Sequence, residues 1–276
     1  MARRASSKKL KAYKKQLTQS GGRSDVLTDN PQRLMVVLIT VAACLFFTHY
    51  LKYFTVYDAV LRFFSSTFYG DLQWFNLWRK SLFYDLYAQG WWTFIHLIGY
   101  VVIPLIIIKG CFKERLALYG VQRGDTYRYR LHYLALAAPI VVFAFFASFR
   151  ADFSHTYPFY SLASRSYFDL LVWECLYIMQ FVALEFFFRG FFLHSLQPAL
   201  GFNSIAVMSI PYLMIHFPKP WLEAFGALPF GLLLGWLALR SRSMWGGVAV
   251  HVTIALSMDF FAIWRSGHLP TQWWPG

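Results

Sequence analysis

Long apolar runs that are almost free of charge are the feature of this sequence that most restricts its fold. The stretches 34–51 and 91–108 contain no Asp, Glu, Lys or Arg, and similar runs follow through the rest of the chain. A transmembrane helix needs about 20 consecutive, mostly apolar residues, so each run is long enough to cross a bilayer. The runs therefore predict a helical membrane protein.

Composition supports the same fold class. Only 14% of the residues are charged and 58% are hydrophobic, with a mean hydropathy of +0.42, whereas about a quarter of the residues in a soluble domain are charged. We predict an all-α polytopic membrane bundle with about seven transmembrane helices and an interfacial amphipathic region. The predicted spans are 34–51, 91–108, 131–149, 169–196, 203–217, 224–239 and 244–264.

The segment 52–90 separates the first two spans and mixes charged with aromatic residues, among them Arg62, Trp74 and Trp78. A helix that lies in the headgroup region needs one apolar and one wet face, and this mixture supplies both. An aromatic platform for nucleotides would use the same residues. A membrane-interface belt is the simpler interpretation.

The net charge of +13 is concentrated at the N-terminus, where residues 1–33 hold nine Lys or Arg and only two Asp. A basic segment just before a transmembrane helix is typical of contact with anionic lipids, and no nucleic-acid recognition motif accompanies it. We predict a basic, flexible cytoplasmic tail over 1–33, with a short helical patch at 7–16, a transmembrane domain over 34–264 and a short tail over 265–276. Anionic lipids, and no nucleic acid, are the partners expected for the N-terminal tail.

The other positive segments follow one pattern. If the spans are as predicted, loop 109–130 and the pair Arg240 and Arg242 lie on the same side as the N-terminal tail. Because Lys and Arg concentrate on the cytoplasmic side, we predict a multi-pass protein of the cell inner membrane with a cytoplasmic N-terminus. Cys44, Cys111 and Cys175 are widely spaced, which argues against a thiolate metal site.

Glu185 and Arg189 lie four residues apart inside one of the most apolar runs. That spacing places both side chains on one helix face, where they can pair. Charges at membrane depth are costly unless they are paired or hydrated, so they commonly mark a functional site. Glu174, about three turns before Glu185, shares this face, and a structural ion pair that locks two helices is the alternative.

Two further apolar segments carry histidines: Tyr212 and His216 on one, and His251 on the last. The order Glu-xxx-Arg, Tyr-xxx-His and His resembles the CPBP family of intramembrane proteases (CAAX proteases and bacteriocin-processing proteins, or ABI family), whose motifs are Glu-Glu-xxx-Arg, Phe-xxx-His and His-xxx-Asn/Asp. The resemblance covers about residues 115–264.

The sequence departs from the family pattern at three positions. Leu184 replaces the first Glu, Tyr212 replaces the Phe, and Ala255 replaces the Asn or Asp. In the family the first Glu, with the His of the second motif, is thought to activate water. Glu223 and Asp259 are nearby carboxylates that could compensate.

The resemblance implies an endopeptidase that hydrolyses a peptide bond of a membrane-associated or lipidated substrate. Glu185 would be the general base, His216 would hold the water, and His251 would stabilise the oxyanion. Arg189, Asp259, Glu223 and Tyr212 would support the site. No cofactor is expected, although Glu185, His216 and His251 could together ligate zinc.

Two other function classes remain open. A catalytically inactive relative would use the same cavity to bind a lipid-like or peptide ligand or to scaffold a partner, and Leu184 and Ala255 favour it. A proton-coupled transporter would also contain intramembrane Glu and His, but no inverted repeat is evident. The protease requires Glu185 and His251, predicted in mid-span, to meet His216, predicted near the end of its span.

Overall fold

The computed structural model describes residues 31–276, and every regular element in that range is helical. The helical patch predicted at 7–16 lies outside the described residues. Six helices in this range are long and apolar enough to cross a membrane. They are Pro31–Leu51, Tyr84–Cys111, Thr126–Ala147, Tyr167–Leu200, Trp221–Ser241 and Trp245–Ser266.

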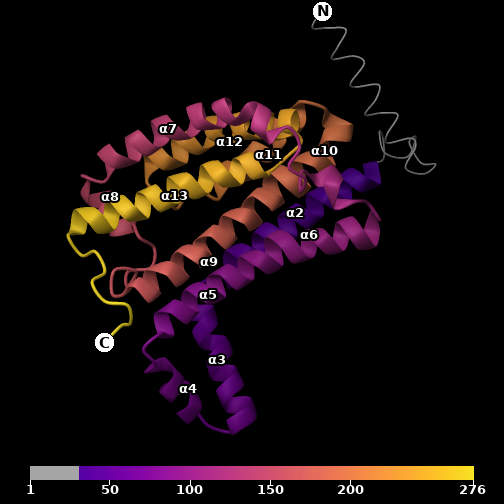
Figure 1. The fold of residues 1–276 in the computed structure, drawn as a ribbon. Coiled ribbons are helices and arrows are strands. Elements are labelled where there is room, and N and C mark those ends of the chain that lie inside the picture. The colour runs from indigo at the N-terminus through magenta and orange to yellow at the C-terminus, as the bar shows by residue number, and fades with distance from the viewer. Residues whose placement is uncertain (1–30) are drawn as a thin grey trace, which may run out of the picture.

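The polytopic helical bundle predicted from the apolar runs is therefore confirmed, with one difference in the count. The segment predicted as a fifth span, 203–217, forms the shorter apolar helix α11, Asn203–Met214. The chain leaves α11 through a turn that includes His216 and Pro218 and re-enters a helix at Trp221. In the part of the chain that the structure describes, six long apolar helices and the short helix α11 thus form the bundle (Figure 1).

Several long helices are composite. The second span runs through α5 (Tyr84–Leu97), α6 (Ile103–Ile106) and two π-helical turns, and the fourth joins α9 (Tyr167–Glu185) to α10 (Leu193–Leu200) through the π-helical segment Phe186–Phe192. The remaining spanning helices are α2 (Pro31–Leu51), α7 (Arg130–Ala147), α12 (Trp221–Ser241) and α13 (Trp245–Ser266).

The region predicted to be interfacial forms two helices, α3 (Phe54–Tyr69) and α4 (Gln73–Arg79). Both extend beyond the end of α5 (Figure 1). A stacked series of rings, Tyr69, Trp74, Trp78 and Tyr87, runs along them, with centroids 5.8, 5.6 and 4.8 Å apart. The aromatic residues of this region therefore pack largely on one another.

The segments predicted to share the positive side of the membrane lie together. Arg33 at the start of α2 pairs with Glu114 at 2.8 Å, and Asp125 in the following loop lies 3.6 Å from Arg242 after α12. Residues 31–33, which were predicted to belong to the tail, are helical in α2, and Arg33 is anchored there by this ion pair. We call this end of the bundle, with loop 112–129 and Ser241–Met244, the basic end.

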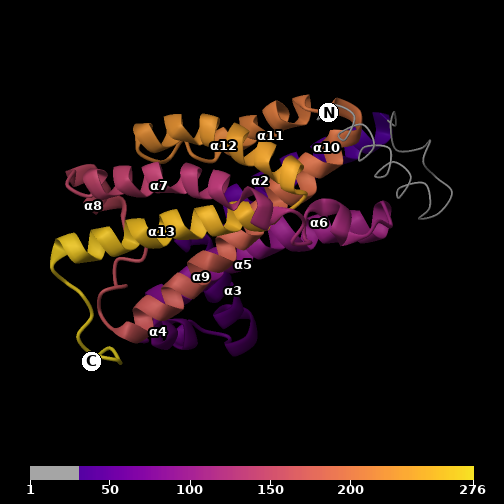
Figure 2. The same ribbon diagram turned by 45° about the horizontal axis from the view of Figure 1, so that its top comes forward.

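The opposite end carries the short C-terminal tail, which crosses from the end of α13 to the start of α9 (Figure 2). The Tyr167 and Phe168 backbone amides at the start of α9 donate to the carbonyls of Gln272 and Trp273, at 2.9 and 3.1 Å. Ser166 caps α9, since its hydroxyl accepts a hydrogen bond from the Asp169 amide. These contacts fix the start of the helix that carries Glu185.

Close helix packing follows the small residues Ala227, Gly231 and Gly235 of α12. A Cβ at Gly231 would lie 2.7 Å from the Tyr212 ring, and one at Gly235 would lie 2.9 Å from Met208. Helix α11 therefore rests directly on this face, as the small-xxx-small spacing predicts. This contact positions Tyr212 and the turn that follows it.

Candidate active site

Glu185 and Arg189 form the fully buried ion pair that their spacing predicts. Arg189 Nη1 donates to Glu185 Oε1 at 2.9 Å, and neither side chain is exposed. Glu185 ends α9, and Arg189 lies in the π-helical segment that follows. A π-helical turn inside an α-helix is uncommon and frequently marks a functional site.

His251 extends this pair towards the cavities. Its Nδ1 lies 2.8 Å from Glu185 Oε1, so this carboxylate oxygen contacts both a guanidinium and an imidazole. The Phe181 ring stacks on the His251 ring at 5.4 Å and fixes its plane. The carboxylate thus lies within ion-pair distance of His251, although among the described residues no hydrogen bond of ordinary geometry reaches Nδ1.

Tyr212 links the two histidines. Its hydroxyl lies 2.9 Å from His251 Nε2, and its backbone carbonyl lies 2.7 Å from His216 Nδ1. The Arg189 guanidinium also covers the Tyr212 ring at 4.0 Å. A continuous chain of contacts thus runs from Arg189 through Glu185, His251 and Tyr212 to His216.

The contact at Nδ1 determines which nitrogen of His216 is basic. A carbonyl oxygen can only accept a hydrogen bond, so Nδ1 carries the proton in the neutral ring and the lone pair is on Nε2. The described residues offer Nε2 no hydrogen-bond partner within range, and His216 lines a cavity. Its Nε2 is therefore available to take a proton.

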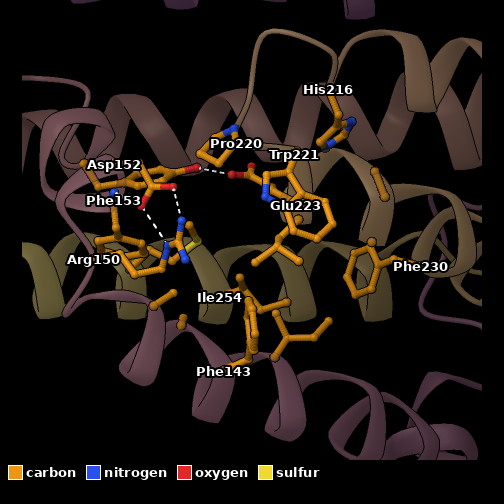
Figure 3. Close-up of a pocket in the computed structure, with 18 of the residues that line it drawn as sticks. Phe143, Arg150, Asp152, Phe153, His216, Pro220, Trp221, Glu223, Phe230 and Ile254 are labelled. Carbon is orange, nitrogen blue, oxygen red and sulfur yellow. Dashed lines mark hydrogen bonds and ion pairs between the residues drawn. The ribbon is translucent and has the colours of Figure 1, made fainter.

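Two cavities meet at this site. The first, of about 490 Å³, lies between α7, α8 (Ala151–Thr156), α12 and α13, and the second, of about 550 Å³, lies between α2, α5, α9 and the turn after α11. Figure 3 shows the first cavity, with His216 and Glu223 on one side and Phe143 and Ile254 across from them. Six residues line both cavities: Tyr157, His216, Glu223, His251, Ile254 and Met258.

The predicted site residues thus fall into two groups. Tyr212, His216 and His251 lie at the cavity walls, whereas Glu185 and Arg189 are sealed behind His251 and line neither cavity. His216, predicted near the end of its span, and His251, predicted in mid-span, both contact Tyr212 and line the same two cavities. The two histidines therefore meet at one site.

The two compensating carboxylates lie in different places. Glu223 faces both cavities, accepts a hydrogen bond from the Tyr157 hydroxyl at 2.6 Å and lies 3.7 Å from Lys219 Nζ. Asp259 instead accepts a hydrogen bond from Trp173 Nε1 at 2.7 Å, is fully buried and lines neither cavity. The structure thus brings Glu223, and not Asp259, to the cavity wall with His216.

Burial affects the charged groups outside the spanning helices. Burial lowers the pKa of Lys219, and the nearby Glu223 carboxylate partly offsets this by raising it. Burial and then the Glu223 charge raise the pKa of Tyr157. Tyr157 therefore stays protonated and donates to Glu223.

Sequence reasoning missed Gly247, which makes room for the Glu185 side chain. A Cβ at this position would lie 2.0 Å from Glu185 Oε2, so only glycine lets α13 approach the carboxylate. Its neighbour Gly246 likewise faces Tyr133, where a Cβ would lie 2.1 Å from the ring. The Gly-Gly pair before His251 was the available signal.

The comparison with protein families bears on this arrangement. A family model described as type II CAAX prenyl endopeptidase Rce1-like matches residues 166–257. The resemblance to the CPBP family is confirmed. The matched CPBP segment begins at the cap of α9, ends within α13 and contains every residue of the contact chain. Searches of curated proteins and of solved structures gave no match.

Two of the three departures from the CPBP motifs lie at the same cavity. Leu184 and Ala255 both line the second cavity, so apolar side chains stand where the family has polar groups. Within residues 31–276, no three His, Cys, Asp or Glu side chains converge as a metal site.

Proposed function

We propose that this protein is an intramembrane endopeptidase that hydrolyses a peptide bond of a membrane-associated substrate. The observation that carries the proposal is the His216 ring, which lines both cavities while its Nδ1 is held by the Tyr212 carbonyl. A neutral imidazole in this position can remove a proton from water. The match to an endopeptidase family supports this reaction class.

In the proposed reaction, His216 Nε2 takes a proton from a water molecule while the water oxygen attacks the peptide carbonyl carbon. Negative charge develops on the carbonyl oxygen. The Tyr212 hydroxyl lies beside the same cavity and would donate a hydrogen bond to that oxygen, while His251 Nε2 supports the hydroxyl. The imidazolium of His216 then returns the proton to the leaving amine. The C–N bond breaks, leaving a carboxylate and an amine.

Glu185 has a different role here from that of the general base suggested by the motif. It is fully buried and contacts Arg189 and His251, so it would orient and polarise His251. Glu223 lines both cavities with His216 and would position the water or the substrate amide.

The test compares new protein N-termini in cells that express the wild type or His216→Ala, identified by mass spectrometry. The exposed histidine variant His155→Ala is the control. We expect a set of membrane-protein termini that depends on His216 and survives in His155→Ala. Cleavage that persists unchanged in a folded His216→Ala protein would refute this assignment.

A non-catalytic binding protein is the second candidate, and one specific observation favours it. Leu184 and Ala255 make the second cavity more apolar at the two positions where the family carries polar groups. For such a protein, Glu185→Gln and His216→Ala would leave the cellular phenotype intact, whereas Gly231→Val, which disrupts the α11–α12 contact, would abolish it.

A further inference from the structure

A groove of about 1200 Å³ lies at the basic end of the bundle, and it shares no lining residue with the two cavities of the candidate active site. It lies between the segment 121–127 and the adjoining turns of α7 and α13, two helices that pack side by side (Figure 1). A ligand of this groove would therefore not occupy the position proposed for the peptide substrate.

Two arginines line the groove, and no carboxylate lines it. Arg123 lies in the segment before α7, and Arg130 is the first residue of α7. Among the described residues neither arginine forms an ion pair. Asp125, which lies between them in the sequence, is instead 3.6 Å from Arg242. The described part of the chain thus leaves two positive charges of this groove without an acidic partner.

The loop that carries Arg123 is held against the end of α12. The Asp125 backbone amide donates to the Ser241 carbonyl at 2.7 Å. A Cβ at Gly124 would lie 2.2 Å from the same carbonyl oxygen, so the backbone of the loop is in direct contact with this helix end. Arg123 therefore extends from a segment whose position is fixed.

Aromatic side chains frame the same groove. The Arg130 guanidinium covers the Tyr127 ring at 4.0 Å, and its Nη1 donates to the Tyr127 carbonyl at 3.1 Å. Trp245, the first residue of α13, donates from Nε1 to the Val121 carbonyl at 2.6 Å. Tyrosine and tryptophan are enriched at the level of the lipid headgroups. The two arginines therefore lie at the ends of spanning helices, where the phosphates of a bilayer are expected.

The rest of the groove is largely apolar and follows the two spanning helices. Leu134, Ala137, Ala249 and Val250 line it, and the Leu134 side chain is 61% exposed. Because α7 and α13 belong to helices that are long and apolar enough to cross a membrane, this face extends from the headgroup level towards the hydrocarbon core. The groove thus combines two cations at one end with a surface suited to an acyl chain.

We propose that this groove binds one anionic phospholipid. The lipid phosphate would accept hydrogen bonds from Arg123 and Arg130, because the planar guanidinium group matches the geometry of phosphate oxygens. One acyl chain would lie on the apolar surface between α7 and α13. A free phosphate would use the arginines alone and leave this surface uncovered, so the composition of the lining favours the lipid.

Native mass spectrometry of the full chain, released from detergent, counts bound lipids and gives an affinity for each. The probes are dioleoyl phosphatidylglycerol, which is anionic, and dioleoyl phosphatidylcholine, which has the same acyl chains and no net charge. We expect the first phosphatidylglycerol to bind about tenfold more tightly, because two basic residues near a membrane surface attract net negative charge. Equal affinities would overturn the proposal.

Charge variants locate the bound headgroup. Arg123→Gln and Arg130→Gln should each weaken phosphatidylglycerol binding about fivefold, the effect of one basic residue near an anionic surface. Arg128→Gln is the matched control, because Arg128 is exposed in the same segment, carries the same charge and lines neither the groove nor the active-site cavities. An equal loss in all three variants would assign the attraction to the overall charge of the chain and overturn the site.

A second pair of variants tests the apolar surface without a change of charge. Ala249→Phe fills the groove and should weaken binding of both lipids about tenfold, the effect of two methylene groups kept out of contact. Ala138→Phe, at an exposed position of α7 outside the groove, should leave both affinities unchanged. Equal affinities for the two Phe variants would refute the placement of the acyl chain, and wild-type melting temperatures in both would exclude unfolding as the cause of a loss.

The soluble headgroup distinguishes a lipid site from a phosphate site. Glycerol phosphate has the anionic group without the acyl chains, so it should fail to displace phosphatidylglycerol at similar concentration. Displacement at similar concentration would assign the arginines to a free phosphate and overturn the lipid site. Each of these outcomes is independent of peptide cleavage, because the groove contains none of the residues of the proposed reaction.

Discussion

At the scale of single residues, the buried carboxylate of Glu185 depends on a glycine in another helix. Gly247→Ala would place a methyl group 2.0 Å from Glu185 Oε2, and this atom belongs to a side chain held by Arg189 and His251. We expect a loss of about 1–3 kcal/mol in the free energy of unfolding and a displaced His251. Thermal unfolding in detergent measures the effect.

Gly90→Ala is the matched control, because a Cβ there meets nothing within 4 Å. It should be neutral or slightly stabilising, since alanine restricts the unfolded chain more than glycine does. Equal melting temperatures for Gly247→Ala and Gly90→Ala would show that α13 does not pack against the carboxylate in this way.

The ion pair itself gives a second prediction. Glu185→Gln leaves the buried Arg189 without a counterion, and removing one partner of a buried pair costs about 3–5 kcal/mol. The double variant Glu185→Gln with Arg189→Met removes both charges and should be less destabilised than the single variant. A double variant whose loss equals the sum of the two single losses would contradict an energetic coupling between these side chains.

Tyr212 offers a test of the proposed chemistry. Tyr212→Phe removes the hydroxyl that contacts His251 Nε2 and keeps the backbone carbonyl that holds His216. We expect cleavage to slow about 10²-fold with little change in substrate binding, because a polarised donor at the developing charge is lost while the base remains. Unchanged turnover would mean that the hydroxyl only connects helices.

These residues also show how far sequence reasoning reaches. The pairing of Glu185 with Arg189 follows from helical spacing alone. The partner of Asp259 does not, because Trp173 lies in another helix 86 residues away and a tryptophan N–H gives no signal of its target. For the same reason, the sequence could name Glu223 as a nearby carboxylate but could not place it at the cavity wall.

At the scale of helices, the contact between α11 and α12 controls the site. Tyr212 rests on Gly231, so Gly231→Ala should shift its ring and move both histidine contacts. We expect a strong loss of cleavage with a smaller loss of stability, measured on the same preparation. Gly90→Ala, outside both cavities and with nothing within 4 Å of an added Cβ, should retain both.

The positions of the spanning helices were predictable because apolar runs report burial in lipid directly. The length of α11 was not, since the run 203–217 stays apolar after the helix ends at Met214. There the carbonyls of Leu213 and Met214 accept hydrogen bonds from His216 and Phe217 in a tight turn. Backbone hydrogen bonding, which hydrophobicity does not encode, therefore decides where His216 lies.

At the scale of the whole molecule, the clustering of basic segments predicts orientation. Exposed Cys111 lies at the basic end, while His268 lies in the C-terminal tail at the other end. In intact cells, a membrane-impermeant maleimide should label a His268→Cys variant that lacks the native cysteines, and should leave a variant retaining only Cys111 unlabelled. Inside-out vesicles should reverse the result, and labelling of Cys111 in intact cells would invert the proposed topology.

If the protein is the proposed endopeptidase, the wall that the two cavities share affects the order in which product fragments leave. His216, His251 and Glu223 line both cavities, so a substrate bound at His216 would have two exit routes. One product fragment could then leave through the second cavity while the other fragment still occupies the first. A compound bound in only one cavity would then slow product release without competing with the substrate for binding. Saturating substrate would therefore not relieve the inhibition.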